Sequence, residues 1–301
     1  MTYRFGEREL ELGGEYLASD LRESNEILGD GAALRARLDE DGYLLIRRLR
    51  PRASVLEIRE EILRSMEPAG ALLPGSELMD GIIQPGAAGH ETTTVRGKDH
   101  LRRSEKFQRF IRMPEVMNFF GRMLGGPAGT FDFQWLRIAG AGASSPVHAD
   151  IVFMGRGTKN LFTCWTPIGD VTLDMGPVVL LQGSHKIEKV RETYGQCDVD
   201  RDRIEGWISK DPVEMVERFG GHWSTTEFQA GDVLIFGMYT LHASLANSSN
   251  RYRISVDTRY QLASEPFDER WVGEQPPMHY EFWRPGVQLE PVAVSRAKWG
   301  F

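Results

Sequence analysis

The hydrophobic periodicity of the chain changes at Gly126, and this change constrains the fold more than any other feature. Before it, apolar residues recur every three to four positions, and after it they alternate with polar residues. Short strand-like runs separated by Gly, Pro, Asn and Asp follow. They are Phe131–Leu136, Val147–Phe153, Leu161–Ile168, Val178–Leu181, Trp223–Phe228, Val233–Phe236 and Tyr252–Gln261. So many short strands predict a β-barrel or a sandwich.

The part before Gly126 is predicted to be mainly helical. Leu34 and Leu38 share one helix face, Gly42 ends that helix, and Tyr43–Ile46 reads as a short strand. The spacing of Ser54 and Glu57 predicts a capping box that starts a second helix. A further helix is expected to begin at Pro114 and to end at Gly125.

We expect residues 1–301 to form a single domain with one β core, because β proteins of this length often do. A helical part spans 1–126, the β core spans 127–261 with a charged insertion at 186–220, and an extension covers 262–301. The loop 68–100 is rich in Pro and Gly and could act as an active-site lid, although a plain surface loop fits the pattern as well.

Charge and composition limit the classes of partner. The formal net charge is −7, which argues against a broad surface for nucleic acid or anionic lipid. No apolar run approaches the length of a membrane span, and the charged first twelve residues do not resemble a secretory signal, so we expect a cytoplasmic protein that acts on a small molecule. Cys164 and Cys197 are expected to be plain thiols.

The triplet His148-Ala149-Asp150 is a candidate metal site. On a strand the His and Asp side chains leave the same face and can bind one ion, while Ala149 faces away. A second triplet of this type, His279-Tyr280-Glu281, occurs in the chain, and chance alone predicts about one, so the triplet needs further support.

The segment 231–261 supplies that support. It reads as two strands joined by the polar stretch Asn247–Asn250, and in the simplest hairpin His242 and Arg253 face each other, with Ser244 a diagonal neighbour of Arg253. A bulge would shift this register.

The last strand alternates strictly between two kinds of side chain. One face carries only polar residues, and a solvent-facing sheet surface would give the same pattern as the lining of a ligand cavity. In a cavity, an Arg of this face would pair with an anion. The polar residues are Arg253, Ser255, Asp257, Arg259 and Gln261.

Two imidazoles and one carboxylate form the facial triad of non-haem Fe(II) oxygenases, which leaves positions open for a cosubstrate and dioxygen. Zinc also accepts His, His and Asp, but the chain has no His-Glu-x-x-His signature of the kind that zinc hydrolases use. The sequence therefore favours iron over zinc.

The order His148-x-Asp150, His242, Arg253 resembles the phytanoyl-CoA dioxygenase family. The resemblance covers about residues 34 to 261 and extends to other strand and turn motifs. These are Cys164-Trp165-Thr166-Pro167, Gly183-Ser184-His185-Lys186, Gly231-Asp232 and Arg253-x-Ser255-x-Asp257-x-Arg259-Tyr260.

The resemblance implies a double-stranded β-helix (jelly-roll) barrel flanked by helices, which uses Fe(II), 2-oxoglutarate and O2. It implies that His148, Asp150 and His242 hold the iron. Arg253, helped by the Ser244 hydroxyl, would bind the far carboxylate of 2-oxoglutarate.

Further residues have weaker assignments. Trp165 matches a family position beside the cosubstrate and Gln134 could donate to it, but ordinary packing explains both equally well. His185 is expected to be structural, while His90 and His100 in the proposed lid could touch substrate.

The expected activity is hydroxylation of an aliphatic C–H bond of a small molecule, with release of succinate and CO2. Asp150 favours hydroxylation, because related halogenases have a small residue at that position. Two alternatives remain: a cupin-like metal-dependent oxygenase or isomerase without 2-oxoglutarate, for which Arg253 would have no use, and a non-catalytic binding protein with the same fold.

Overall fold

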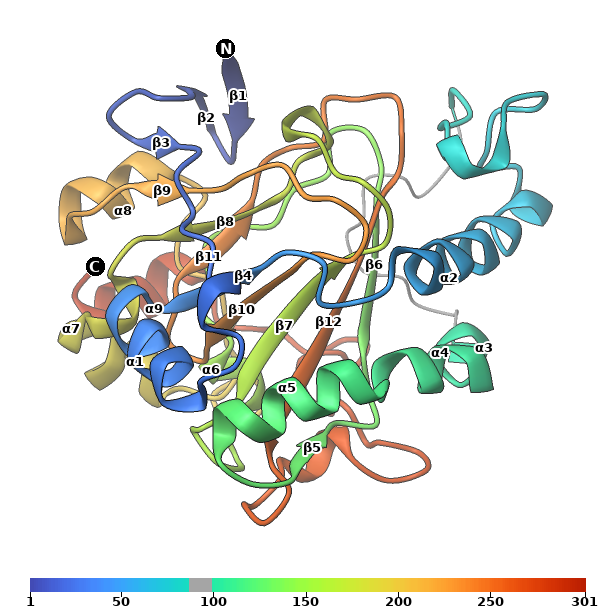
Figure 1. Ribbon diagram of the computed structural model, residues 1–301. Helices are drawn as coiled ribbons and strands as arrows, with labels where there is room; N and C mark the ends of the chain where they lie inside the picture. Colours follow the sequence, from blue (N-terminus) through green and yellow to red (C-terminus); the bar gives the residue numbers. More distant parts are fainter. Residues whose placement is uncertain (87–98) are drawn as a thin grey trace.

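The fold was obtained as a computed structural model, which describes residues 1–86 and 99–301. Two β-sheets face each other, and helices cover the outside of the larger one (Figure 1). The larger sheet has six strands, all paired antiparallel. In spatial order they are β4 (Tyr43–Ile46), β10 (Val233–Gly237), β7 (Phe162–Pro167), β12 (Arg253–Leu262) and β5 (Ala128–Thr130), with β6 (Trp135–Ala139) also paired to β12.

The smaller sheet contains strands from distant parts of the chain. In spatial order they are β11 (His242–Ser244), β8 (Val178–Leu181), β9 (Trp223–Ser224) and β3 (Leu17–Ala18). The strand expected over residues 223–228 is therefore limited to its first two residues, and Phe228 makes a single bridge to Val171. The predicted fold class, mainly β with flanking helices, is confirmed.

Four helices cover the outer face of the larger sheet, because each has an apolar face to bury. They are α1 (Gly31–Asp41), α2 (Arg52–Arg64), α4 (Glu105–Ile111) and α5 (Pro114–Leu124). Phe120 of α5 stacks on Tyr260 of β12 with ring centroids 4.0 Å apart. The remaining helices and the N-terminal hairpin are α3 (Asp99–Arg102), α6 (Ile151–Met154), α7 (Glu188–Glu192), α8 (Pro212–Phe219), α9 (Val292–Trp299), β1 (Thr2–Phe5) and β2 (Arg8–Glu11).

Most helix ends lie where the sequence predicts them, but the prediction of a capping box for α2 is wrong. Asp30 accepts from the first turn of α1, and Gly42 and Gly125 end α1 and α5 in the left-handed conformation. Helix α2 begins directly after Pro51, so Ser54 lies inside the helix and caps nothing. The proline already holds the backbone angle that starts a helix, and no side-chain cap is needed.

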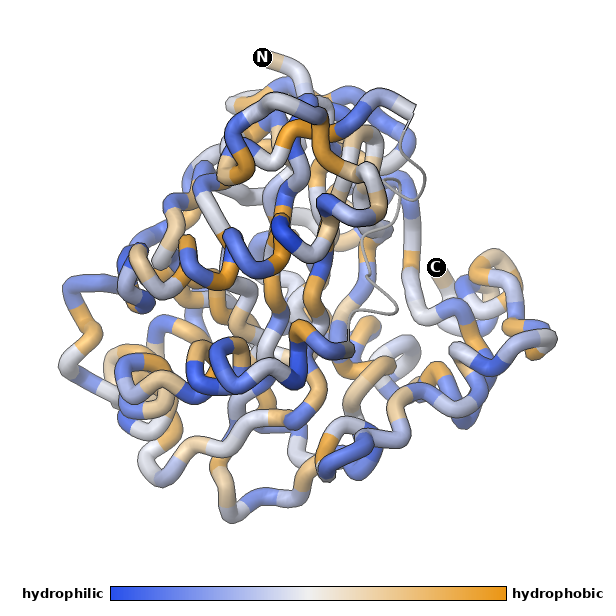
Figure 2. The backbone as a smooth tube through the Cα atoms, turned by 90° about the vertical axis from the view of Figure 1, so that its right-hand side faces the viewer, coloured by the Kyte–Doolittle hydropathy of each residue, from blue (hydrophilic) through white to orange (hydrophobic). Residues whose placement is uncertain are grey.

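Strand β12 is buried on both faces, with a different chemistry on each. Ile254, Val256 and Tyr260 pack beneath the helices. The polar face predicted from Arg253 to Gln261 points into the space between the sheets, and all five of its residues are buried. The alternative of a solvent-facing sheet surface is therefore wrong. Figure 2 shows this alternation of hydrophobic and hydrophilic residues in the strands at the centre of the molecule.

The C-terminal extension packs against one end of the space between the sheets. Trp271 is completely buried, and its ring lies 4.7 Å from that of Trp135 and 5.2 Å from that of Phe133. Helix α9 closes the chain and buries Trp299 against Tyr194. Within the described residues, no helix combines the length and the apolar character needed to cross a membrane.

Candidate metal centre and its cavities

The structure brings His148, Asp150 and His242 together between the sheets. Each offers one ligand atom, and these atoms lie within 4.8 Å of one another. His148 and His242 form an isolated antiparallel bridge, with N–O distances of 3.0 and 2.9 Å, so their rings lie side by side with centroids 4.2 Å apart. The hydrogen bonds between the two backbone segments thus hold the two imidazoles next to each other.

The strand expected over residues 147–153 is wrong. After the bridge at His148 the chain turns, and Asp150 has helical backbone angles and precedes α6. His148 and Asp150 therefore converge through a turn and not through strand alternation. The misreading has a physical cause: Ile151, Val152 and Met154 are all buried, and a short buried apolar run does not distinguish a helix from a strand.

Main-chain carbonyls orient both imidazoles. Nδ1 of His148 lies 2.8 Å from the Pro146 carbonyl, and Nδ1 of His242 lies 3.0 Å from the Thr240 carbonyl. Because a carbonyl only accepts, each Nδ1 carries the proton and each Nε2 keeps a free lone pair. Burial lowers the pKa of both histidines, that of His148 to about 3 with the neighbouring His242 adding to the effect. Both rings are therefore neutral at pH 7, the form that binds a metal.

Asp150 is held as a carboxylate. Its Oδ2 accepts hydrogen bonds from the Thr163 hydroxyl and, at 3.1 Å, from Nη2 of Arg259. Burial opposes ionisation, but the Arg259 guanidinium and the two imidazoles outweigh it and hold the pKa of Asp150 well below its ordinary value. The other oxygen, Oδ1, lies 4.0 Å from Nε2 of His242. That separation is too long for a hydrogen bond.

These residues fit an iron ion. Two neutral imidazoles and one carboxylate are the donor set of the 2-His-1-carboxylate triad. The second oxygen of Asp150 and both Nδ1 atoms are already engaged with protein groups, which is how metal ligands are usually oriented. One donor atom of each residue lies within 4.8 Å of the other two, which is close enough for all three to bind one ion.

A cavity behind the triad, here called the Arg253 cavity, contains three of the predicted cosubstrate residues. Arg253, Ser244 and Trp165 line it together with His148 and His242. The Ser244 Oγ accepts from the Ser145 amide at 2.9 Å, so its own proton is free to be donated. Arg137 of β6 also lines this cavity, and its Nε donates to Asp257 at 2.5 Å.

Arg253 is a buried cation without a counter-ion. Its side chain donates to the Ser255 hydroxyl at 3.0 Å, while its Nε is buried and unpaired, and none of the carboxylates that the structure describes lies within ion-pair distance. Burial, together with the nearby Arg137, lowers its pKa to about 10. An unpaired buried charge is costly, so this site fits a ligand that brings an anionic group.

The hairpin expected between His242 and Arg253 is wrong, although both residues reach the same cavity. Strand β11 pairs with β8 and strand β12 pairs with β6 and β7, so the two residues belong to opposite sheets. The polar stretch between them crosses from one sheet to the other. Asn247 holds this crossing, because its Nδ2 donates to the carbonyls of Ala139 and Arg251 at 3.0 and 2.8 Å.

Gln134 does not line the Arg253 cavity. The strand that was expected to carry it on a polar face begins only at Trp135. Its Nε2 donates to the Phe131 carbonyl at 2.9 Å, and its Oε1 accepts from Gln108. The predicted contact with a cosubstrate is therefore replaced by a local hydrogen bond that shapes the turn before β6.

A second cavity, here called the aromatic cavity, opens on the other side of His148 and has a volume of about 270 Å³. Asp150 and Arg137 line it, so the metal centre lies between the two cavities. Its aromatic walls come from β6, α6, the insertion and the C-terminal extension. The aromatic wall residues are Trp135, Phe153, Trp207, His279, Phe282 and Trp283.

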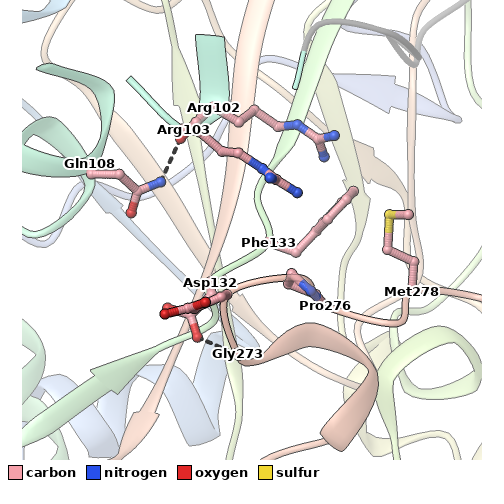
Figure 3. Close-up of a pocket in the computed structure, with 9 residues that line it drawn as sticks. Arg102, Arg103, Gln108, Asp132, Phe133, Gly273, Pro276 and Met278 are labelled. Carbon is pink, nitrogen blue, oxygen red and sulfur yellow. Dashed lines mark hydrogen bonds between the residues drawn. The ribbon is translucent and has the colours of Figure 1, made fainter. Parts of the chain in front are cut away.

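A third cavity, of about 400 Å³, is lined by Phe133 and by residues of α3 and the C-terminal extension. Figure 3 shows Arg102 and Arg103 extending into it, with Phe133 and Met278 beside them. The Arg102 guanidinium lies 4.1 Å from the centre of the Phe133 ring. That ring in turn contacts Trp135 at 4.9 Å.

Several residues of this site have little or no signal in the sequence. Arg137 interrupts the apolar run Trp135–Ala139, and a charge within a strand of that kind was an available signal for a polar interior. Trp207 and Phe282 lie in irregular segments, where no periodicity marks them. Their role as cavity walls follows only from the three-dimensional structure.

The other histidines that the structure describes, apart from His279, lie away from the metal centre. Nε2 of His185 contacts the Asp39 carbonyl at 3.0 Å, as expected for a structural histidine. His100 is exposed on α3, and it lines neither the Arg253 cavity nor the aromatic cavity. His90, and with it residues 87–98 of the proposed lid, lies outside the described residues.

Comparisons with known proteins agree with this geometry. Residues 38–255 match the family model described as phytanoyl-CoA dioxygenase. The chain is 28% identical over 258 residues to 1-deoxypentalenic acid 11-beta-hydroxylase from Streptomyces arenae, covering 82% of this chain and 86% of the relative.

Two solved structures have the same fold. The epimerase SnoN from nogalamycin biosynthesis, in complex with Fe3+, alpha ketoglutarate and nogalamycin RO, matches with a TM-score of 0.57 at 20% identity, covering 87% of this chain and 99% of that one. EctD from S. alaskensis, with 2-oxoglutarate and 5-hydroxyectoine, matches with a TM-score of 0.57 at 16% identity, covering 91% and 90%. The expected jelly-roll fold is thereby confirmed.

Proposed function

Because the chain belongs to the phytanoyl-CoA dioxygenase family of Fe(II)- and 2-oxoglutarate-dependent oxygenases, we propose that it hydroxylates an aliphatic C–H bond of a small molecule and releases succinate and CO2. The observation that carries this proposal is the position of the His148, Asp150 and His242 cluster directly beside the buried guanidinium of Arg253, which has no carboxylate within ion-pair distance among the described residues. An iron ligand set and a carboxylate anchor are thus adjacent.

Each residue has a defined task in this proposal. His148, Asp150 and His242 hold the iron through Nε2, Oδ1 and Nε2. Arg253 pairs with the far carboxylate of 2-oxoglutarate, and the Ser244 hydroxyl donates a second hydrogen bond to it. Trp165 packs against the cosubstrate from β7. Bound iron, 2-oxoglutarate and O2 supply the oxidant that attacks the C–H bond.

The protein contributes position and exclusion of water. The aromatic walls hold the substrate beside His148 and Asp150, so that one C–H bond faces the metal centre. Retention of the Asp150 carboxylate favours hydroxylation over halogenation. A cavity of about 270 Å³ suits a small free molecule better than a coenzyme A thioester. The likeness to a hydroxylase of 1-deoxypentalenic acid supports a substrate of that size.

A cupin-like enzyme that does not use 2-oxoglutarate is the alternative. In such an enzyme Arg253 would remain a buried cation without an ion-pair partner among the described residues, at a considerable cost in stability. This guanidinium therefore favours the 2-oxoglutarate-dependent activity.

An anaerobic titration tests the proposal. Fe(II) is added to the metal-free protein, followed by 2-oxoglutarate, and the metal-to-ligand charge-transfer band is recorded. Pyruvate is the matched control, because it has the same keto-acid group but lacks the carboxylate that Arg253 binds. We expect the band with 2-oxoglutarate at much lower concentration than with pyruvate. Equal affinity for the two keto acids, or no band, would contradict the proposal.

A further inference from the structure

His279 is a histidine of the aromatic cavity that the proposed reaction does not use. It belongs to the C-terminal extension, and its side chain is 2% exposed. Its Nδ1 lies 2.8 Å from Oδ2 of Asp200. Its Nε2 has no hydrogen-bond partner among the residues that the structure describes, so this is the polar atom that the ring can present to the cavity.

Asp200 fixes which nitrogen carries the proton. Its Oδ2 also accepts from Arg270 at 2.7 Å, and its Oδ1 accepts from the amides of Glu281 and Phe282 at 2.9 and 3.0 Å. Burial opposes ionisation of Asp200, but the hydrogen bonds from His279, Phe282 and Arg270 outweigh it and hold the pKa of Asp200 well below its ordinary value, so the carboxylate only accepts. Nδ1 of His279 must therefore donate, and in the neutral ring Nε2 is an acceptor.

The surroundings of His279 identify the kind of ligand. Aromatic rings contact the imidazole, with centroids 4.7 Å away for Trp271, 4.9 Å for Trp283 and 5.3 Å for Phe282. Both guanidiniums of the described cavity lining already have carboxylate partners, Arg259 in Asp150 and Arg137 in Asp257, so neither needs a charged ligand to neutralise it. An apolar wall whose guanidiniums are already paired fits a neutral molecule. Burial also lowers the pKa of His279, which keeps the ring uncharged.

We propose that His279 is a substrate-binding residue whose Nε2 accepts a hydrogen bond from a hydroxyl group of a neutral, mainly apolar substrate, and that Asp200 is the positioning residue that fixes its tautomer. This inference rests on the proposed function, because it assigns the aromatic cavity to the substrate. A hydroxyl donates to Nε2, whereas a ketone has nothing to donate. The pair thus selects an alcohol over the corresponding ketone or hydrocarbon.

Binding of three matched probes to the holoenzyme without oxygen tests this selection. The probes are 2-decalol, decalin and 2-decalone, which share one ring system. Binding is followed by the charge-transfer band and by tryptophan fluorescence, since Trp135, Trp207 and Trp283 line the cavity. We expect 2-decalol to bind about fivefold or more tightly than either other probe, as one net hydrogen bond allows. Equal binding, or no binding of 2-decalol, overturns the proposal.

The variant Asp200→Asn should reverse the tautomer of His279, so it gives the most specific test of the proposal. The Glu281 and Phe282 amides hold the amide oxygen of the new side chain, so its NH2 group donates to Nδ1 of His279 and moves the ring proton to Nε2. Arg270 keeps its partners Asp198 and Asp268. We expect this variant to bind 2-decalone several-fold more tightly than decalin, a preference that the wild type lacks.

Two further variants separate this effect from a loss of structure. Asp198→Asn changes the same Arg270 cluster without touching His279, and it should keep the wild-type order of probes. His279→Phe keeps the aromatic contacts and should bind all three probes equally. Identical behaviour of Asp200→Asn and Asp198→Asn would contradict the role of Asp200. Absence of the charge-transfer band itself would instead count against the proposed function, while fluorescence still measures probe binding.

Discussion

The two cavities that meet at His148 are built in different ways. Strands of the two sheets supply the Arg253 cavity, whose key groups are charged or hydroxyl-bearing. The aromatic cavity takes much of its wall from irregular segments, with Trp207 in the insertion and His279 and Phe282 in the C-terminal extension. In the proposed function, the scaffold thus holds the groups that bind the shared cosubstrate, and loops hold those that bind the substrate. Loops change more freely than the elements they connect, so substrate specificity can vary while the chemistry is kept.

His242→Ala should have the largest effect, because it removes a ligand on which both cavities depend. We expect loss of the charge-transfer band and a fall in succinate formation of at least about 100-fold. Removal of a group that only hydrogen-bonds to a metal ligand already lowers metal affinity or activity 10- to 100-fold. His222→Ala is the control, because His222 is an exposed histidine paired with Asp20. Similar losses in both variants would show that the effect is not specific to the metal centre.

Arg253→Met should impair binding in the Arg253 cavity and leave the aromatic cavity unchanged. We expect the dissociation constant of 2-oxoglutarate to rise about 100-fold, which corresponds to about 2.7 kcal/mol for the loss of a buried charge pair. Iron binding should be retained. Arg251→Met provides the control, because Arg251 is half exposed and pairs with Asp80. Unchanged affinity for 2-oxoglutarate in Arg253→Met would remove the assigned anchor.

Phe282→Ala should damage only the aromatic cavity. Phe282 is partly buried, and the loss of its contact area with the probe costs about 1.4 kcal/mol, so we expect roughly tenfold weaker binding of 2-decalol. Affinity for 2-oxoglutarate should not change. Phe301→Ala truncates an aromatic residue that packs on Phe219 outside both cavities, and it should affect neither ligand. If Phe282→Ala also weakened the binding of 2-oxoglutarate, the two cavities would not be independent.

Acidification should have the smallest effect on iron binding. With the pKa of His148 lowered to about 3, protons do not compete with the metal at pH 6, whereas a histidine with its ordinary pKa of 6.5 would be mostly protonated there. We expect iron affinity to change less than about twofold between pH 8 and pH 6, measured by anaerobic competition with a chelator. A tenfold weakening at pH 6 would mean that the imidazoles are protonated in the metal-free protein.

The low pKa of His148 should make the stability of the metal-free protein depend on pH, although it should make iron binding nearly independent of pH. In the unfolded chain His148 binds a proton below about pH 6.5, and in the folded protein it does not until about pH 3, so the unfolded state binds more protons between these values. The free energy of unfolding of the metal-free protein should therefore decrease as the pH falls through this window. Urea unfolding of the wild type and His148→Ala at pH 7 and pH 4.5 measures the difference, which should be smaller in the variant.

The sequence predicted the Arg253 cavity better than the aromatic cavity, for a physical reason. His148, Asp150, His242 and Arg253 stand out because such side chains are expensive to bury without a task. Their residue types were therefore informative even where the local structure was read wrongly. The turn at Asp150 and the crossing at Asn247 depend on contacts between distant segments, which a local pattern does not contain. For an aromatic residue in a loop, such as Trp207, the sequence does not distinguish a place in the hydrophobic core from a place in the wall of a binding cavity.

The contacts between the two imidazoles and the Pro146 and Thr240 carbonyls have a consequence for how the site can evolve. Many metal sites orient a histidine with a side-chain carboxylate, which a single mutation can delete. Every amino acid carries a carbonyl, so neither contact depends on which residue stands at position 146 or 240. Genetic drift can thus alter those two positions without erasing the contacts, and only a shift of the main chain itself would disturb them.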